Sequence, residues 1–188
     1  LAKLPEDMNF FTQITMEAAE DTEFLDAMRK ARIKGALVGV ESVLTVSTDL
    51  DPFLVDHRRL YQGRTPAVVM PRTVEQVSRV LSFCHEHLIS VVPHGGNTSY
   101  CGGATPDESG EQIVLSLKKL NRIRGVDPLN WSMVAEAGCI LADVQRAADA
   151  ADRFFPLSLG SEGSCQIGGN LATNAGGTNV VRYGMMRD

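Results

Sequence analysis

The chain has 188 residues, of which 44% are hydrophobic and 22% charged, and it carries a formal net charge of −5. This length predicts one domain or slightly more, with a core large enough to fold without disulfides or metals. The acidic balance argues against a nucleic-acid binder, and no run of about 18 apolar residues is present to span a membrane. The four cysteines form no CxxC pair and no zinc-type spacing, which favours reduced thiols in a cytoplasmic protein.

The ends of the chain and its glycine content are unusual. The sequence begins at Leu1 without a signal-like segment and stops at Asp188 directly after a glycine-rich region, so we expect a fragment of a longer protein. Fourteen of its 17 glycines lie between Gly95 and Gly184. Glycine at this density indicates turns, or backbone that approaches something closely.

The first part of the chain is acidic and mixed in character. Its apolar spacing predicts a surface helix over about 21–33. The next stretch, 41–64, carries turn signals, and we interpret the run His57-Arg58-Arg59 within it as a solvated turn.

From residue 65 the pattern becomes regular. Short apolar runs at 67–70, 88–92 and 113–117 predict buried strands, and helical spacing predicts a helix from Val74 to Leu88. Thr73 and Gln76 have the spacing of a capping box at the start of this helix. Strand, helix and strand within about 25 residues predict a βαβ unit with parallel strands.

A different pattern follows residue 117. Apolar runs at 123–126 and 133–136 flank Asp127-Pro128-Leu129-Asn130, which predicts an antiparallel hairpin, and an amphipathic helix is expected over 140–151. The chain is therefore expected to have an α+β fold with two α/β lobes, a small parallel βαβ lobe and a partly antiparallel lobe.

The first glycine-rich segment runs from Pro93 to Gly103, PHGGNTSYCGG, directly after the second expected strand. Its glycines and short polar side chains could form a nest of backbone amides for an anion such as phosphate, although it holds no Lys or Arg. The chain contains no Gly-Lys and no Gly-x-Gly, which excludes a P-loop and a Rossmann fingerprint. A long solvent-exposed connection remains the alternative.

The second segment extends from Leu159 to Gly177, and no charged residue occurs from Gly163 to Val181. Small side chains among Asn, Thr and Ser would let backbone lie against a flat polar ring without placing a charge beside it. The alternative is a tightly packed Gly/Ala corner. Taken together, the two segments suggest a ligand with a diphosphate and a heteroaromatic ring, which describes a dinucleotide such as FAD.

Six stretches in order resemble the FAD-binding domain of the PCMH (vanillyl-alcohol oxidase) type, in the branch of D-lactate dehydrogenases, D-2-hydroxyglutarate dehydrogenases and a glycolate oxidase subunit. They are PAVVMPRTVEQVSRVLSFC, VVPHGGNTSYCGGATP, IVLSLKKLNRIRGVD, VAEAGCILADVQ, FPLSLGSEGSCQIGGNLATNAGG and VRYGMMRD. The resemblance covers about residues 60–188. It implies a lead-in over 1–59, helical or irregular, and a PCMH-type domain over 60–188 that is incomplete at its C-terminus and lacks the substrate cap.

The resemblance also implies the cofactor-binding residues. The first segment would hold the FAD diphosphate through Pro93, Gly95, Gly96, Asn97, Thr98, Ser99, Gly102 and Gly103. The second would lie along the flavin end through Gly160, Gly163, Ser164, Ile167, Gly168, Gly169, Asn170, Thr173, Asn174 and Gly176. Relatives with covalent flavin often carry His where this chain has Asn97, so non-covalent FAD is expected.

The function that the resemblance implies is oxidation of a D-2-hydroxy acid to the 2-oxo acid, with hydride passing to flavin N5. The catalytic base would lie in the missing cap, so the catalytic residues stay unknown, no metal site is expected, and the fragment should be inactive alone. His94 could touch the cofactor or only shape its loop. Cys101, Cys165 and Glu162 are more simply interpreted as packing or loop residues.

Two other functions stay open at this point. The chain could belong to another flavoenzyme of the same fold acting on a different alcohol, or it could be a cofactor-binding module without its own catalysis. The substrate, the electron acceptor, and whether the protein forms a homo-oligomer or works with a partner subunit are not specified by the sequence, and a mitochondrial location is a second option.

Overall fold

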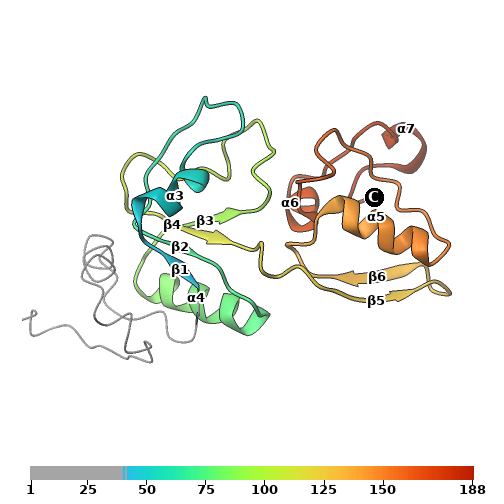
Figure 1. Cartoon of the computed structure of the whole chain (residues 1–188), viewed down its shortest axis with the longest axis horizontal. Helices are drawn as coiled ribbons and strands as arrows, with labels where there is room; N and C mark the ends of the chain where they lie inside the picture. The colour runs from blue at the N-terminus through green and yellow to red at the C-terminus, as the bar shows by residue number, and fades with distance from the viewer. Residues whose placement is uncertain (1–39, 41) are drawn as a thin grey trace, which may run out of the picture. The chain divides into compact units, whose positions relative to one another are not determined.

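The computed structural model describes residue 40 and residues 42–188, which fall into two compact units (Figure 1). The first unit comprises the described residues up to His94 together with Ser99–Ser116. The second comprises Gly95–Thr98 and Leu117–Asp188. The helix expected over 21–33 lies outside the described residues. No helix in the described part of the chain has both the length and the apolar character needed to cross a membrane.

The first unit is built on a four-stranded sheet in the order β1-β2-β4-β3. Its strands are β1 (Val43–Leu44), β2 (Val68–Val69), β3 (Val91–His94) and β4 (Ile113–Ser116). β2 and β3 both pair in parallel with β4, which lies between them, and β1 joins β2 antiparallel. The expected βαβ unit is thus confirmed, with β4 inserted between its two parallel strands.

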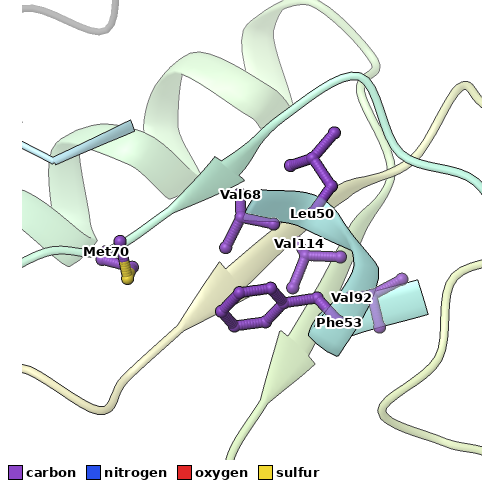
Figure 2. Close-up of a cluster of buried hydrophobic side chains, with 6 residues drawn as sticks. All are labelled: Leu50, Phe53, Val68, Met70, Val92 and Val114. Carbon is purple, nitrogen blue, oxygen red and sulfur yellow. The ribbon is translucent and has the colours of Figure 1, made fainter. Parts of the chain in front are cut away.

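Two helices cover opposite faces of this sheet, α3 (Ser47–Leu54) and α4 (Val74–Glu86) (Figure 1). On the α3 face, Leu50 and Phe53 pack against the strand residues Val68, Val92 and Val114 (Figure 2). β1 and α3 therefore share a core with the strands, although they precede residue 60. The boundary expected at that residue stays a prediction.

The start and end of α4 show how local sequence limits the helix. The Thr73 hydroxyl accepts a hydrogen bond from the Gln76 amide at 3.2 Å, which is the expected N-cap. The Gln76 side chain in turn accepts from the Arg72 amide at 2.7 Å. Leu88 adopts a φ of +55° and is 91% exposed, so it leaves the helix in a left-handed turn. The expectation that a strand begins at Leu88 is wrong for this reason, and β3 begins at Val91.

The second unit is an antiparallel hairpin packed by a helix. β5 (Ile123–Asp127) pairs with β6 (Ser132–Ala135), and α5 (Leu141–Ala150) follows, as the sequence predicts. The Asp127 carboxylate accepts from the amides of Leu129 and Asn130, both at 3.0 Å, and so forms the expected turn. The core includes Leu141, Val144 and Ile167.

Two short helices in this unit differ from expectation. α6 (Ile167–Ala172) lies inside the second glycine-rich segment, where the sequence pattern indicated no helix. α7 (Val180–Tyr183) follows the same segment, where the sequence pattern likewise indicated no helix. Neither helix changes the α+β fold class that the sequence predicts.

Candidate cofactor site

The two glycine-rich segments meet within the second unit. A Cβ atom on Gly96 would lie 2.1 Å from the Ser164 carbonyl oxygen and 2.9 Å from the Cys165 Cα. A Cβ on Gly95 would lie 3.5 Å from Oε1 of Gln166. Only glycine fits at position 96, because the opposing atoms are backbone. The structure thus brings together two segments that the sequence predicts to serve one ligand.

Two buried amide side chains lie at the start of α6. Gln166 is the N-cap residue and Asn170 follows four residues later, on the same side of the helix. They are 8% and 5% exposed, and neither Gln166 Oε1 nor Asn170 Oδ1 has a hydrogen-bond partner among the described residues. Buried acceptors are normally satisfied, so these two are suited to a ligand that brings N–H or O–H donors. Asn170 was expected here from the sequence, whereas Gln166 was missed.

The surroundings of these acceptors are neutral and in part open. Within the described structure, a Cβ on Gly160, Gly163 or Gly169 would meet no atom within 4 Å. Neither the Gly96 nor the Thr98 amide donates to a backbone carbonyl of the described residues. Backbone amides without a carbonyl partner, uncharged side chains and unsatisfied acceptors fit an uncharged polar ring attached to a phosphate group. The residues present therefore fit FAD.

Backbone hydrogen bonds to the turn between β6 and α5 fix the position of α6. The Gly168 amide donates to the Ala137 carbonyl at 2.8 Å, and the Ile167 amide donates to the Cys139 carbonyl at 2.9 Å. A Cβ on Gly168 would lie 2.7 Å from the Ala137 Cβ, so glycine is required for this approach. Gly168 and Ile167 thus hold the helix in place, and Ile167 is a buried core residue.

The buried carboxylate of Glu136, directly after β6, anchors the same turn. The Glu136 side chain is 3% exposed, and its Oε1 accepts from the guanidinium groups of Arg122 and Arg124 at 3.0–3.2 Å. Its Oε2 accepts from the Arg122 amide at 2.9 Å. These bonds, those from the Arg122 side chain foremost, hold the pKa of Glu136 at about 2, well below its ordinary value.

The later residues of the second segment make contacts inside the unit. The Thr173 hydroxyl donates to the Gly169 carbonyl at 2.8 Å, and the Ser164 hydroxyl donates to the Ser161 carbonyl at 3.3 Å. Asn174 has a φ of +51°, and its Oδ1 accepts from the Arg187 amide at 3.0 Å. Gly176 lies beside Met185, with a virtual Cβ 3.5 Å from its Cε. These side chains shape the segment and order the chain that follows it.

The second half of the first segment belongs to the first unit. Gly102 has a φ of +68°, and a Cβ there would lie 2.6 Å from Cδ2 of Tyr61. Tyr61, Gly102 and Gly103 line a cavity of about 500 Å³ beside the edge strand β3. The other lining residues are Gln62, Val91, Val92, Pro93, Thr105, Pro106, Asp107, Glu108 and Gln112. The Ser99 hydroxyl accepts a hydrogen bond from the Cys101 amide at 3.3 Å. Asn97, in the half of the segment that belongs to the second unit, has a φ of +52°.

Other residues considered from the sequence have simple positions. His94 is 7% exposed in the first unit, with its ring 4.9 Å from that of Phe53. Glu162 lies 3.5 Å from the Gln145 side-chain nitrogen. Cys165 is a buried free thiol and Cys101 an exposed one. Within residues 40 and 42–188, no three His, Cys, Asp or Glu side chains group closely enough to hold a metal ion.

Comparison with known proteins places this site in a family. The family model described as "FAD binding domain" matches residues 65–188, so the chain belongs to the FAD-binding domain family. Bovine mitochondrial D-2-hydroxyglutarate dehydrogenase (Bos taurus) is 39% identical over 145 residues, 77% of this chain and 26% of that protein. The D-2-hydroxyglutarate–pyruvate transhydrogenase of Saccharomyces cerevisiae is 36% identical over 138 residues, 73% of this chain and 27% of that protein. The chain therefore spans about a quarter of the length of these curated relatives.

Solved structures show the same fold. Alkyldihydroxyacetonephosphate synthase superimposes with a TM-score of 0.73 at 17% identity, over 89% of this chain and 31% of that one. p-Cresol methylhydroxylase superimposes with a TM-score of 0.62 at 29% identity, over 84% of this chain and 30% of that one. The α+β architecture described above is thus that of PCMH-type FAD-binding domains, and the chain is an FAD-binding domain similar in sequence to part of the D-2-hydroxyglutarate dehydrogenases.

Proposed function

We propose that the full-length protein oxidises a D-2-hydroxy acid to the corresponding 2-oxo acid, and that this chain supplies the part that binds FAD non-covalently. The observation that carries the proposal is the meeting of Gly95–Thr98 with Ser164–Gln166, which joins the two predicted binding segments in one unit. The relatives support the substrate class, since those named above act on D-2-hydroxyglutarate.

The residues of this chain have binding and orienting roles in that proposal. The backbone amides of Gly96 and Thr98 would face the diphosphate, while Gln166 and Asn170 would accept hydrogen bonds from the ring system. When bound, FAD would supply the two-electron chemistry by taking hydride at N5. No charged side chain occurs from Gly163 to Val181, so this segment would place no charge beside the ring.

The binding mode, the electron acceptor and the compartment are further parts of the proposal. Asn97 stands where covalently flavinylated relatives often have His, which supports a dissociable cofactor. The acceptor of the electrons is a separate molecule or subunit. All four cysteines are free thiols in the structure, which agrees with a reducing, cytoplasm-like compartment.

The substrate class can be tested by anaerobic reduction of the full-length protein. Flavin absorbance near its long-wavelength maximum is followed while D-lactate, D-2-hydroxyglutarate, D-malate and their L enantiomers are added in turn. Bleaching by at least one D-2-hydroxy acid and by none of the L enantiomers is the expected result. A flavin-loaded protein that no D-2-hydroxy acid reduces, but that a benzylic alcohol or phenol does, would replace the proposal with the alternative flavoenzyme.

A further inference from the structure

The outer edge of β3 is open in the first unit. β3 is the last strand in the order β1-β2-β4-β3, so among the described residues only its β4 side is paired. The Ile113 amide of β4 donates to the Ser90 carbonyl at 3.0 Å, and in this parallel pair the backbone groups of Val92 face β4 as well. Those of Val91 and Pro93 face outward, which leaves one N–H and two carbonyls without a strand partner.

The cavity of about 500 Å³ follows this open edge. β3 forms one wall through residues 91–93, and the loop over residues 105–112, here called the acidic loop, forms another. The ring of Tyr61, which is 48% exposed, completes the lining. All of these residues belong to the first unit, so a segment placed in the cavity would run beside an unpaired strand edge of the same unit.

Hydrogen bonds set the shape of the acidic loop. The Arg64 amide donates to the Asp107 carbonyl at 2.8 Å, and the Asp107 amide donates to Oε1 of Gln112 at 2.8 Å. Oδ1 of Asp107 accepts from the Ser109 amide at 3.0 Å. The loop is therefore a built wall of the cavity, which reduces the ordering that a bound partner would require.

The charge of the cavity lining is negative. The lining contains Asp107 and Glu108 and no Lys, Arg or His. Both carboxylates are exposed, and neither forms an ion pair within the described part of the chain. Two carboxylates without a cation repel a phosphate and attract an ammonium or guanidinium group. The face of the Tyr61 ring is a further surface on which such a cation can lie.

We propose that the open edge of β3 docks an extended, basic segment of a partner polypeptide, which adds a short strand and places a Lys or Arg side chain against Asp107 and Glu108. The charge selects this partner, since a second copy of this chain, with its net charge of −5, is disfavoured beside the acidic loop. Pro93 has no N–H to donate, so pairing is limited to a short segment. The inference is independent of the proposed binding of FAD.

The test measures the binding of synthetic peptides to the full-length protein by fluorescence anisotropy. The probes are the amidated peptides Thr-Val-Arg-Val-Thr, Thr-Val-Gln-Val-Thr and Thr-Val-Glu-Val-Thr, each with an uncharged fluorophore at its N-terminus. A fourth probe is the arginine peptide with N-methylated backbone amides, which cannot pair as a strand. The protein variants are D107N and E108Q, with E111Q as the matched control, because Glu111 is an exposed carboxylate of the acidic loop that does not line the cavity.

We expect the arginine peptide to bind about tenfold more tightly than the glutamate peptide, with the glutamine peptide between them, because the lining is negative. D107N and E108Q should each weaken the arginine peptide about fivefold, since one charge-assisted contact is lost, whereas E111Q should stay within about twofold of the wild type. N-methylation should weaken the arginine peptide about tenfold, because the strand edge can no longer pair. Saturating FAD should leave these affinities unchanged.

Four results would overturn the inference. Equal affinities for the three peptides, or no binding of any, would remove the selection by charge. Equal affinities for the arginine peptide and its N-methylated form would show that the edge of β3 is not used. Equal effects of E108Q and E111Q would remove the cavity lining from the contact, and displacement of the peptide by FAD would assign the cavity to the cofactor. Failure of the wild type to bind FAD is a separate result, which would refute only the proposed function.

Discussion

The buried carboxylate of Glu136 gives a quantitative prediction about the second unit. Its pKa of about 2, against the ordinary value of 4.5, corresponds to about 3 kcal/mol of preference for the ionised form in the folded state. The side chains of Arg122 and Arg124 are 68% and 47% exposed, so water screens part of this interaction. We expect E136Q, which removes the charge and keeps the volume, to lower the free energy of unfolding by about 2 kcal/mol at pH 7.

The pH dependence follows from the direction of the pKa shift. The folded-state pKa lies below the unfolded value, so the stabilisation by Glu136 is fully present above about pH 4.5. It is lost progressively as the pH falls toward 2, where the folded protein also becomes protonated at this site. The difference between wild type and E136Q should therefore be constant from pH 7 to about 5 and shrink below that range.

Urea unfolding followed by circular dichroism between pH 7 and pH 3 measures this difference. The matched control is R146Q, which removes an ion pair with Asp143 between two exposed side chains and should cost under about 0.5 kcal/mol. Equal losses in E136Q and R146Q, or a loss in E136Q that does not change between pH 7 and pH 3, would contradict a lowered pKa of Glu136 in the folded protein.

Two further predictions concern glycine packing and thiol reactivity. G96A should weaken FAD binding at least tenfold in an FAD titration, because its Cβ would lie 2.1 Å from the Ser164 carbonyl oxygen. The control G125A, whose Cβ meets no described atom within 4 Å, should leave the FAD affinity unchanged. Equal FAD affinities of the two variants would contradict this packing of Gly96. Cys101, which is exposed, should be alkylated in the native protein well before Cys84, whose burial raises its pKa to about 11, and mass spectrometry of partially labelled protein showing the reverse order would be inconsistent with the structure.

The strands and long helices could be predicted because their local patterns agree with their tertiary environment. The run Ile113–Ser116 is buried at every position, which matches a continuous apolar strand in a parallel sheet. Thr73 forms the N-cap that its spacing to Gln76 indicates. In these segments, local preference and burial favour the same structure.

The short helix α6 could not be predicted because contacts distant in sequence stabilise it. Its sequence, IGGNLA, contains two glycines and an asparagine, all poor helix formers. The helix begins where the amides of Ile167 and Gly168 donate to the carbonyls of Cys139 and Ala137. Nothing in the local pattern of residues 167–172 reports those partners.

The candidate site was predictable in composition but not in arrangement. The two uncharged glycine-rich segments were evident, yet only the structure shows Gly96 against Ser164. The burial of Gln166 could not be predicted either, because in the sequence Gln166 resembles the other polar residues of the segment. The solvated turn expected at Arg58 is exposed in the structure, whereas the contact of Arg58 with the Tyr100 ring could not be predicted because the two residues are distant in sequence.

We propose that this domain holds FAD non-covalently. The most direct measurement is the visible spectrum of the purified full-length protein, followed by acid precipitation and quantification of flavin in the supernatant and pellet. We expect a flavin spectrum with close to one FAD per chain, all of it released into the supernatant. A protein that neither carries nor takes up flavin, or flavin that stays in the pellet, would contradict it.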